Sequence, residues 1–138
     1  MEYKFSHVHK VRVRYGETDQ MGYCYYGNYA QYFEIGRVEA LRDLGLSYRV
    51  MEDEGVMLPV SELTIKYLKP SFYDDELVIE TFLTEIKGPR IYFRYEIRNA
   101  NNEITTTATT TLVFVDKENK RPTKSPEALE IALSKFLI

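Results

Sequence analysis

Two carboxylates and several aromatic side chains occupy one glycine-bearing segment near the start of the chain. Glu17 and Asp19 lie in this segment, and a helix is expected to begin soon after it, at Asn28. Backbone N–H groups at a helix N-terminus have no intrahelical acceptor and lie at the positive end of the helix dipole. They can hold an oxyanion or a polarised carbonyl oxygen, while a nearby carboxylate acts as nucleophile or general base. The arrangement therefore suits chemistry on a carbonyl compound.

The same pattern also has an ordinary structural interpretation. Asp is common in loops, and a solvated Asp ahead of a capped helix needs no chemistry to explain it. The chain has 12 Tyr, six of them between Tyr15 and Tyr32, and tyrosines more often pack than react. A loop with this much apolar material is expected to pack onto another part of the molecule. The residue types alone leave both interpretations open.

The helix after the segment must position it. Asn28 is a favourable N-cap residue, and apolar or small residues recur at helical spacing from Tyr29 to Leu44. Gly45 is expected to end this helix. Gly36 lies inside it at a cost of roughly 1 kcal/mol relative to Ala, which predicts close approach of another backbone. A second, short helix is expected over residues 47–54.

Period-two alternation predicts strands on both sides of the long helix. One strand is expected before the loop, over residues 7–15, and the others over 62–67, 77–87, 91–98 and 104–115. A final helix is expected from about Ser125. One long helix against about five antiparallel strands is an α+β architecture. Because one helix cannot cover such a sheet and both of its edges, we expect pairing with another copy.

Composition limits the classes of function. A chain of 138 residues suits one domain, spanning 1–138, that folds without disulfides or metals. The 18 basic and 21 acidic residues give a net charge of −3, without the positive excess typical of nucleic-acid binders. No apolar run approaches the roughly 20 residues of a membrane span. A single Cys and no visible export signal predict a cytoplasmic protein.

Three motifs resemble those of a known family. They are Arg-Tyr-x-Glu-Thr-Asp-x-Met-Gly at 14–22, Tyr-Tyr-x-Asn-Tyr at 25–29 and Tyr-Phe-Glu-x-x-Arg-x-Glu at 32–39. Together they resemble the opening of hotdog-fold acyl-CoA thioesterases, in the branch of the 4-hydroxybenzoyl-CoA and Tol-Pal-associated thioesterases. The resemblance covers essentially the whole chain, although the later strands match only in pattern. It implies a hotdog fold, in which an antiparallel sheet of about five strands wraps around one long helix.

The resemblance also implies roles for particular residues. The catalytic carboxylate of the family corresponds to Asp19, in preference to Glu17, and acts as nucleophile or general base. The backbone N–H that polarises the thioester oxygen corresponds to Tyr26. Apart from the resemblance, the clustered Tyr23, Tyr25 and Tyr26 are candidates to line an acyl pocket, with packing as the more usual role of such residues. No metal or redox cofactor is implied, since coenzyme A is part of the substrate. A homodimer or homotetramer is implied, with the active site at the subunit interface.

Coenzyme A carries phosphate charges, so a net acidic protein needs a local basic patch to bind it. Lys87 and Arg90 flank a Gly-Pro junction between two strands and resemble the position where family members place basic residues. Lys66 and Lys69 could add to this patch. Ordinary charged strand ends explain the same residues equally well.

Other reactive residue types receive structural interpretations. Cys24 has no His with an evident reason to lie beside it, so we interpret it as a small, half-buried residue. His7 and His9 lie two apart on one strand, too few for a metal site, and are expected at the surface or at an edge. Two pairs on the long helix are expected to form surface ion pairs at i, i+3 spacing, namely Glu34 with Arg37 and Glu39 with Arg42.

The expected function is therefore hydrolysis of an acyl-CoA thioester. One alternative is a non-catalytic module of the same fold that binds acyl thioesters or serves assembly, because fold alone does not imply activity. Another is a thioesterase acting on acyl-carrier-protein, an acidic partner for which a net charge of −3 does not favour binding. The acyl group, short aliphatic or aromatic, and the choice between dimer and tetramer stay open.

Overall fold

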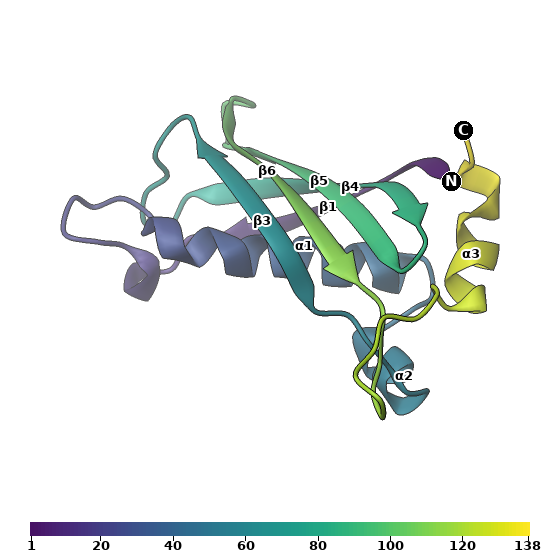
Figure 1. The fold of residues 1–138 in the computed structure, drawn as a ribbon. Helices are drawn as coiled ribbons and strands as arrows, with labels where there is room; N and C mark the ends of the chain where they lie inside the picture. The colour runs from purple at the N-terminus through teal and green to yellow at the C-terminus, as the bar shows by residue number, and fades with distance from the viewer.

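Five antiparallel strands form one curved sheet in a computed structural model that describes residues 1–138 (Figure 1). Their order across the sheet is β1-β4-β5-β6-β3, so β1 and β3 are the edges. The strands are β1 (Glu2–Arg12), β3 (Val60–Tyr67), β4 (Glu76–Lys87), β5 (Arg90–Arg98) and β6 (Ile104–Val113). The alternation predicted for β5 is confirmed, since its inward side chains Ile91, Phe93, Tyr95 and Ile97 are all buried. The α+β hotdog architecture expected from the sequence is the one observed.

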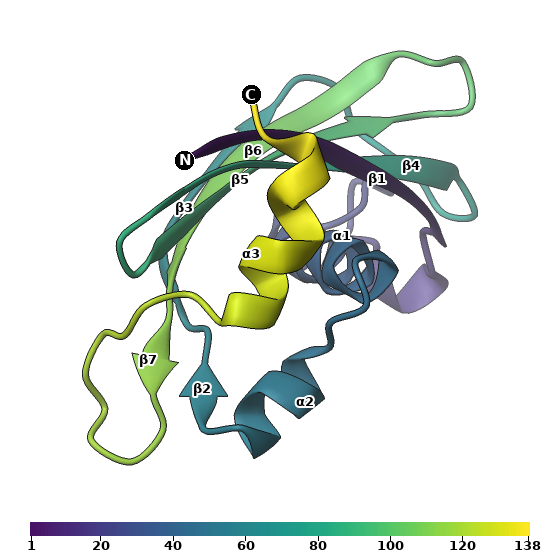
Figure 2. The same ribbon diagram turned by 90° about the vertical axis from the view of Figure 1, so that its right-hand side faces the viewer.

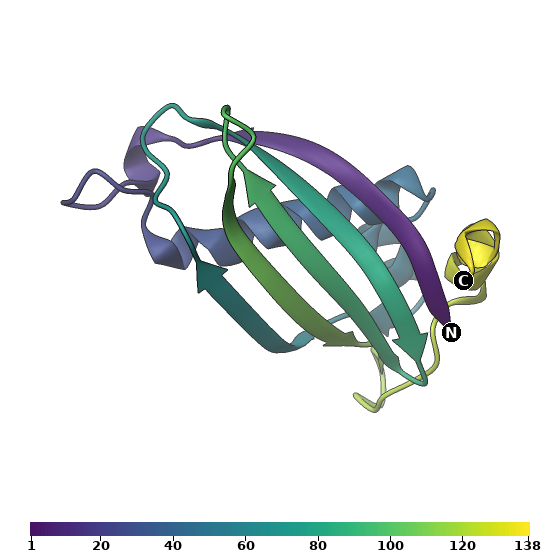
Figure 3. The ribbon, with the colours of Figure 1, turned by 90° about the horizontal axis from the view of Figure 1, so that it is seen from above.

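The long helix α1 (Tyr29–Asp43) crosses the concave face of the sheet (Figures 1 and 3). It packs against β1 and β4 through its buried side, which includes Phe33 and Leu41. A Cβ on Gly36 would lie 2.4 Å from Thr81 Oγ1 on β4, so glycine is what allows the helix to come this close. The predicted close approach of another backbone is wrong in its partner, because side chains of β4 approach Gly36 instead.

Four short elements, two helices and two strands, lie away from the loop that carries Glu17 and Asp19. Helix α2 (Tyr48–Asp53) leads into β2 (Val56–Met57), which pairs with β7 (Val115–Asp116) in a second, two-stranded sheet. Helix α3 (Glu127–Leu133) lies beside the end of the large sheet, near both termini (Figure 2). The Ile138 N–H donates to the Glu2 carbonyl at 3.0 Å, which ties the two ends of the chain together.

Two predicted strands have different bounds in the structure. The strand expected over 7–15 instead runs from Glu2 to Arg12, because it pairs with β4 along its whole length, and a 3₁₀ turn follows at Tyr15–Glu17. The strand expected over 104–115 is interrupted at Phe114, where the chain leaves the large sheet for the small one. Both differences arise from pairing partners that are distant in the sequence.

The edge strand β3 has no cover of its own. Val60, Leu63 and Tyr67 along it are exposed, and its outer edge has no strand partner within the chain. The expectation that the helix leaves a sheet edge uncovered is therefore confirmed. No helix in the structure is long and apolar enough to cross a membrane.

Candidate active site

A cavity of about 260 Å³ opens where the loop before α1 meets the end of β3. Seven of its ten lining residues are hydrophobic. Three of the residues predicted from the sequence, Asp19, Tyr23 and Tyr26, line it together. Tyr29 from α1, Tyr67 from β3 and Lys69 from the segment after β3 complete much of the wall.

Asp19 has one carboxylate oxygen held and the other free. Its Oδ1 accepts hydrogen bonds from the backbone N–H of Met21 at 2.9 Å and of Tyr23 at 3.2 Å. Backbone bonds between Asp19 and both Gly22 and Tyr23 close the same turn, and Gly22 has a φ of +81° that favours glycine. Oδ2 accepts no hydrogen bond from the protein. The turn therefore orients the side chain and leaves one oxygen for chemistry.

The helix N-terminus contributes unpaired backbone donors to the same region. A 3₁₀ turn at Tyr26–Asn28 runs directly into α1. The N–H groups of Tyr26 and Gly27 donate to no acceptor in the protein. Asn28 is the N-cap residue of α1, as predicted, but its side chain accepts no hydrogen bond from the first helical turn; its Nδ2 donates to the Glu17 carbonyl at 2.7 Å. These N–H groups thus keep the capacity to bind an oxygen of a ligand.

Tyrosine rings form much of the cavity wall. The Tyr67 ring lies edge-to-face with the Tyr26 ring at a centroid distance of 6.2 Å and with the Tyr29 ring at 5.3 Å. The Tyr25 ring packs against the Tyr26 ring in a tilted arrangement, at a centroid distance of 4.6 Å, but Tyr25 does not line this cavity. A neighbouring phenol, Tyr26, and the negative charge of Asp19 both raise the pKa of Tyr25. Tyr25 therefore lies within electrostatic reach of the carboxylate without forming the wall.

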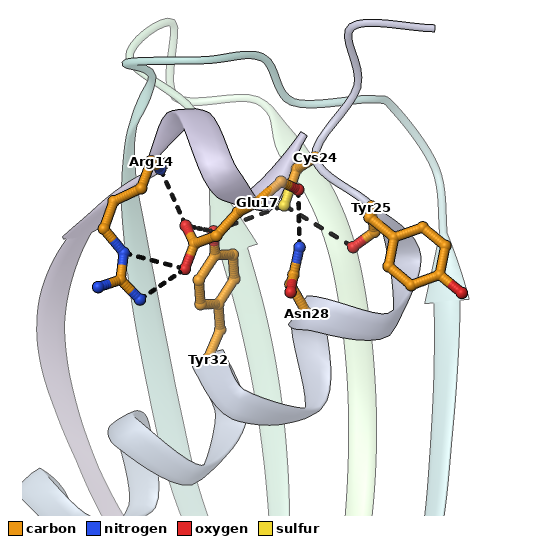
Figure 4. A network of polar contacts seen from close by, with 6 residues as sticks. All are labelled: Arg14, Glu17, Cys24, Tyr25, Asn28 and Tyr32. Carbon is orange, nitrogen blue, oxygen red and sulfur yellow. Dashed lines mark hydrogen bonds and ion pairs between the residues drawn. The ribbon is translucent and has the colours of Figure 1, made fainter. Parts of the chain in front are cut away.

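Glu17, the competing carboxylate, is enclosed in a hydrogen-bond network (Figure 4). Its Oε1 accepts the Arg14 backbone N–H at 2.9 Å and the Tyr32 hydroxyl at 2.8 Å. Its Oε2 accepts the Arg14 guanidinium at 2.9 Å and 3.2 Å. Burial raises the pKa of Glu17, but the hydrogen bonds from Arg14 and Tyr32 outweigh it, so its pKa is lower than usual. These contacts indicate a structural role for Glu17 in the loop.

Cys24 lies beside this network (Figure 4), and it is buried. Its Sγ is 3.5 Å from the Tyr32 hydroxyl oxygen, and burial raises the pKa of the thiol. A buried thiol with a raised pKa is a poor nucleophile. No hydrogen bond joins this thiol to His7 or His9, which are half-buried on the edge strand β1.

The two basic residues predicted to bind phosphate lie far from the cavity of their own chain. Lys87 and Arg90 face each other across the β4–β5 hairpin, whereas the loop of the cavity follows the other end of the sheet, where Arg12 pairs with Glu76 (Figure 3). The 12 residues of β4 separate the two ends by roughly 36 Å. Of the predicted basic residues, only Lys69 lines the cavity, where it pairs with Glu103.

Some residues near the site have roles that sequence reasoning did not foresee. The Tyr67 hydroxyl donates to the Tyr26 carbonyl at 3.1 Å, a contact between distant segments without a local sequence signal. Of the predicted helix pairs, Glu39 and Arg42 form an ion pair at 3.4 Å. The prediction for Arg37 is wrong: it is buried, and its Nε donates to the Tyr48 hydroxyl at 3.1 Å, because α2 folds back over that side of α1.

Comparison with known proteins identifies the family. Residues 13–133 match the thioesterase-like superfamily. YneP of Bacillus subtilis is 40% identical over 84% of this chain and 86% of its own. The acyl-CoA thioester hydrolase YbgC of Escherichia coli is 33% identical over 86% of this chain and 89% of its own. The DHNA-CoA thioesterase structure from Staphylococcus aureus has a TM-score of 0.89 and 33% identity, covering 94% of this chain and 89% of that chain.

Proposed function

The chain belongs to the thioesterase-like superfamily, and from that premise we propose that it is an acyl-CoA thioesterase. The reaction adds water to the thioester and releases a carboxylic acid and coenzyme A. One observation carries the proposal. Asp19, with a free carboxylate oxygen, and Tyr26, whose N–H is unpaired at the start of a helix, line the same largely apolar cavity.

With Asp19 as general base, the steps follow from this geometry. Its free oxygen takes a proton from water as the water oxygen attacks the thioester carbon. The carbonyl oxygen becomes an oxyanion and accepts a hydrogen bond from the Tyr26 N–H, a donor already fixed before the reaction begins. The carbon–sulfur bond then breaks, and the proton held by Asp19 passes to the departing thiolate. No metal or redox cofactor enters these steps.

Asp19 can also act as the nucleophile. Its oxygen would then attack the thioester carbon directly, release the thiolate and form an acyl anhydride that water hydrolyses. Turnover in ¹⁸O-labelled water detects the anhydride when water attacks its Asp19 carbonyl carbon, because ¹⁸O then enters the Asp19 carboxylate over repeated turnovers. The general-base route puts the label only into the product acid. Mass spectrometry of the peptide containing Asp19 reads the outcome.

A homodimer formed through β3 would bring the remaining predicted residues to the cavity. Tyr67 lies at the cavity end of β3, while Val60 lies at the end near the Lys87–Arg90 hairpin. Antiparallel pairing of two β3 edges about a two-fold axis would bring the partner's hairpin end beside this chain's cavity. The partner's Arg90 would then lie about three strand spacings away, roughly 15 Å. In this dimer Lys87 and Arg90 bind coenzyme A phosphates across the interface, and Tyr23 contacts the acyl group from the cavity wall.

Thiol release tests the proposal. Wild-type protein is assayed with acyl-CoA substrates that differ in acyl length and aromaticity, and calorimetry measures binding of a non-hydrolysable acyl-CoA analogue. The proposal requires both binding and thiol release, and the substrate with the highest kcat/KM identifies the acyl class. Binding without thiol release would support the non-catalytic module instead. Thiol release only from acyl-carrier-protein would support the second alternative.

A further inference from the structure

Tyr67 connects the free edge of the sheet to the turn that begins helix α1. It is the last residue of β3, and its side chain is 47% exposed. Its hydroxyl donates to the Tyr26 carbonyl at 3.1 Å, across 41 residues of sequence. Its ring packs edge-to-face against Tyr26 and Tyr29, so the phenol has a fixed direction.

The carbonyl that Tyr67 binds belongs to the peptide group between Tyr26 and Gly27. The same oxygen accepts a second hydrogen bond, from the Tyr29 N–H of the first helical turn. The N–H of this peptide group, on Gly27, donates to no acceptor in the protein. Hydrogen bonds to a carbonyl oxygen polarise the peptide and strengthen its N–H as a donor. The Tyr26–Gly27 peptide group thus accepts two hydrogen bonds at its oxygen and donates none from its nitrogen.

The proposed function supplies a use for this free N–H. We propose that Tyr67 is a positioning residue for the oxyanion site, and that its hydroxyl fixes and polarises the Tyr26–Gly27 peptide. The Gly27 N–H then serves as a second donor beside the Tyr26 N–H. Its contribution is greatest when negative charge has developed on the thioester oxygen, so it favours the transition state over bound substrate.

Other tyrosines near the cavity show that packing alone does not require this hydroxyl. Tyr23 packs edge-to-face on Phe72 at 5.5 Å, and Tyr73 packs in the same way on Tyr15 at 5.7 Å. Neither hydroxyl makes a hydrogen bond to the protein, in contrast to that of Tyr67. The Tyr67 ring contributes to the wall, and its hydroxyl has the separate task of holding the peptide.

The variant Tyr67→Phe keeps the ring and removes only the hydroxyl. Loss of a direct oxyanion donor costs on the order of 10²–10³ in rate, so loss of a group that supports one donor is expected to lower kcat about 10-fold. KM and the thermal unfolding temperature should stay at the wild-type values. Tyr73→Phe removes a hydroxyl from an aromatic pair outside the cavity and serves as the matched control, with wild-type kinetics.

Infrared difference spectroscopy supplies a readout that a merely structural role would not change. The acyl-CoA that the wild type hydrolyses fastest is labelled with ¹³C at its carbonyl and bound to Asp19→Asn, in which turnover is expected to be about 10²–10⁴-fold slower. Hydrogen bonding at the oxyanion site lowers the carbonyl stretching frequency. The shift should be smaller in the Asp19→Asn/Tyr67→Phe double variant than in Asp19→Asn alone.

Each outcome bears on a different proposal. An active wild type with an unchanged kcat in Tyr67→Phe, or with equal carbonyl shifts in the two Asp19→Asn backgrounds, would overturn the role of Tyr67 alone. A fall in kcat that accompanies a lower unfolding temperature would show only structural support and would overturn it too. A wild type that releases no thiol from any acyl-CoA would overturn the proposed function and this inference together.

Discussion

Two carboxylates of one loop, Glu17 and Asp19, have opposite surroundings. Glu17 is only 9% exposed, and its two oxygens together accept four hydrogen bonds. Asp19 lines an open cavity, and only one of its oxygens is engaged. A carboxylate whose oxygens are all occupied by donors is poorly available to attack carbon or take a proton. The difference therefore separates a structural acid from a candidate catalytic one.

Side-chain length explains much of the difference. The longer Glu17 side chain reaches back to the backbone N–H and guanidinium of Arg14, three residues earlier, and across to Tyr32 on α1. The shorter Asp19 side chain bonds to its own downstream backbone, as Asp often does in turns. The contacts of Glu17 connect the loop to α1, and the contacts of Asp19 orient one of its carboxylate oxygens.

The largest expected effect follows from removing the charge on Asp19. In Asp19→Asn the amide oxygen can still accept the Met21 and Tyr23 N–H groups, so the turn is kept. A positioned general base typically contributes 10²–10⁴-fold, and kcat should fall by about that factor. Thermal unfolding and size-exclusion chromatography should match the wild type. Asp53→Asn, an exposed change on α2, is the control and should retain full kcat.

The corresponding change at Glu17 is expected to affect stability more than chemistry. Glu17→Gln replaces one acceptor oxygen with an amide group that cannot accept the Arg14 hydrogen bonds. The Arg14 guanidinium is exposed, so solvent screens its hydrogen bonds to Glu17, and the free energy of unfolding should fall by about 1–2 kcal/mol. Denaturant titration measures it, with the exposed Glu118→Gln as a control within about 0.5 kcal/mol of the wild type.

Acid should remove the stabilisation from Glu17. Its folded-state pKa is below the ordinary value of 4.5, so its contribution is fully present above that pH. The contribution is lost as the pH falls through the lowered folded-state pKa, where the carboxylate becomes protonated in the native protein. The stability difference between wild type and Glu17→Gln should therefore shrink in denaturant titrations below about pH 4.5. A difference that instead grows on acidification would show that the pKa is raised.

The smallest expected effect is at Cys24, next to the Glu17 network. Its thiol is buried, and burial raises its pKa, so we expect it not to act as the nucleophile. Cys24→Ala should lower the free energy of unfolding by about 1 kcal/mol and leave kcat within the same order of magnitude. Loss of turnover comparable to that of Asp19→Asn would assign the chemistry to the thiol.

Local patterns predicted the elements more accurately than their contacts. Helical spacing over Tyr29–Leu44 and alternation in β5 depend on nearest neighbours along the chain, and both elements formed where expected. The start of β1 and the small β2–β7 sheet depend on pairing with distant strands, which no local pattern encodes. The ends of strands that are set by pairing with distant strands therefore could not be predicted from the sequence.

The candidate site likewise has features that local sequence predicts and contacts that it does not. The motif around Asp19 and Tyr26 was recognisable because its residues lie close together in sequence, and the fold brings both to one cavity. The network that engages Glu17 depends on Tyr32, which α1 carries back to the loop. The Tyr67 contact depends on β3, which begins more than thirty residues after Tyr26. Such contacts between separate elements become visible only in three dimensions.

The most direct test of the different roles of Asp19 and Glu17 compares thiol release from one acyl-CoA by wild type, Asp19→Asn and Glu17→Gln. Each rate is corrected for the fraction of folded protein. The account predicts a loss of at least about 100-fold in Asp19→Asn and less than about 10-fold in Glu17→Gln. Wild-type thiol release by Asp19→Asn, or an equal loss per folded molecule in the two variants, would contradict it.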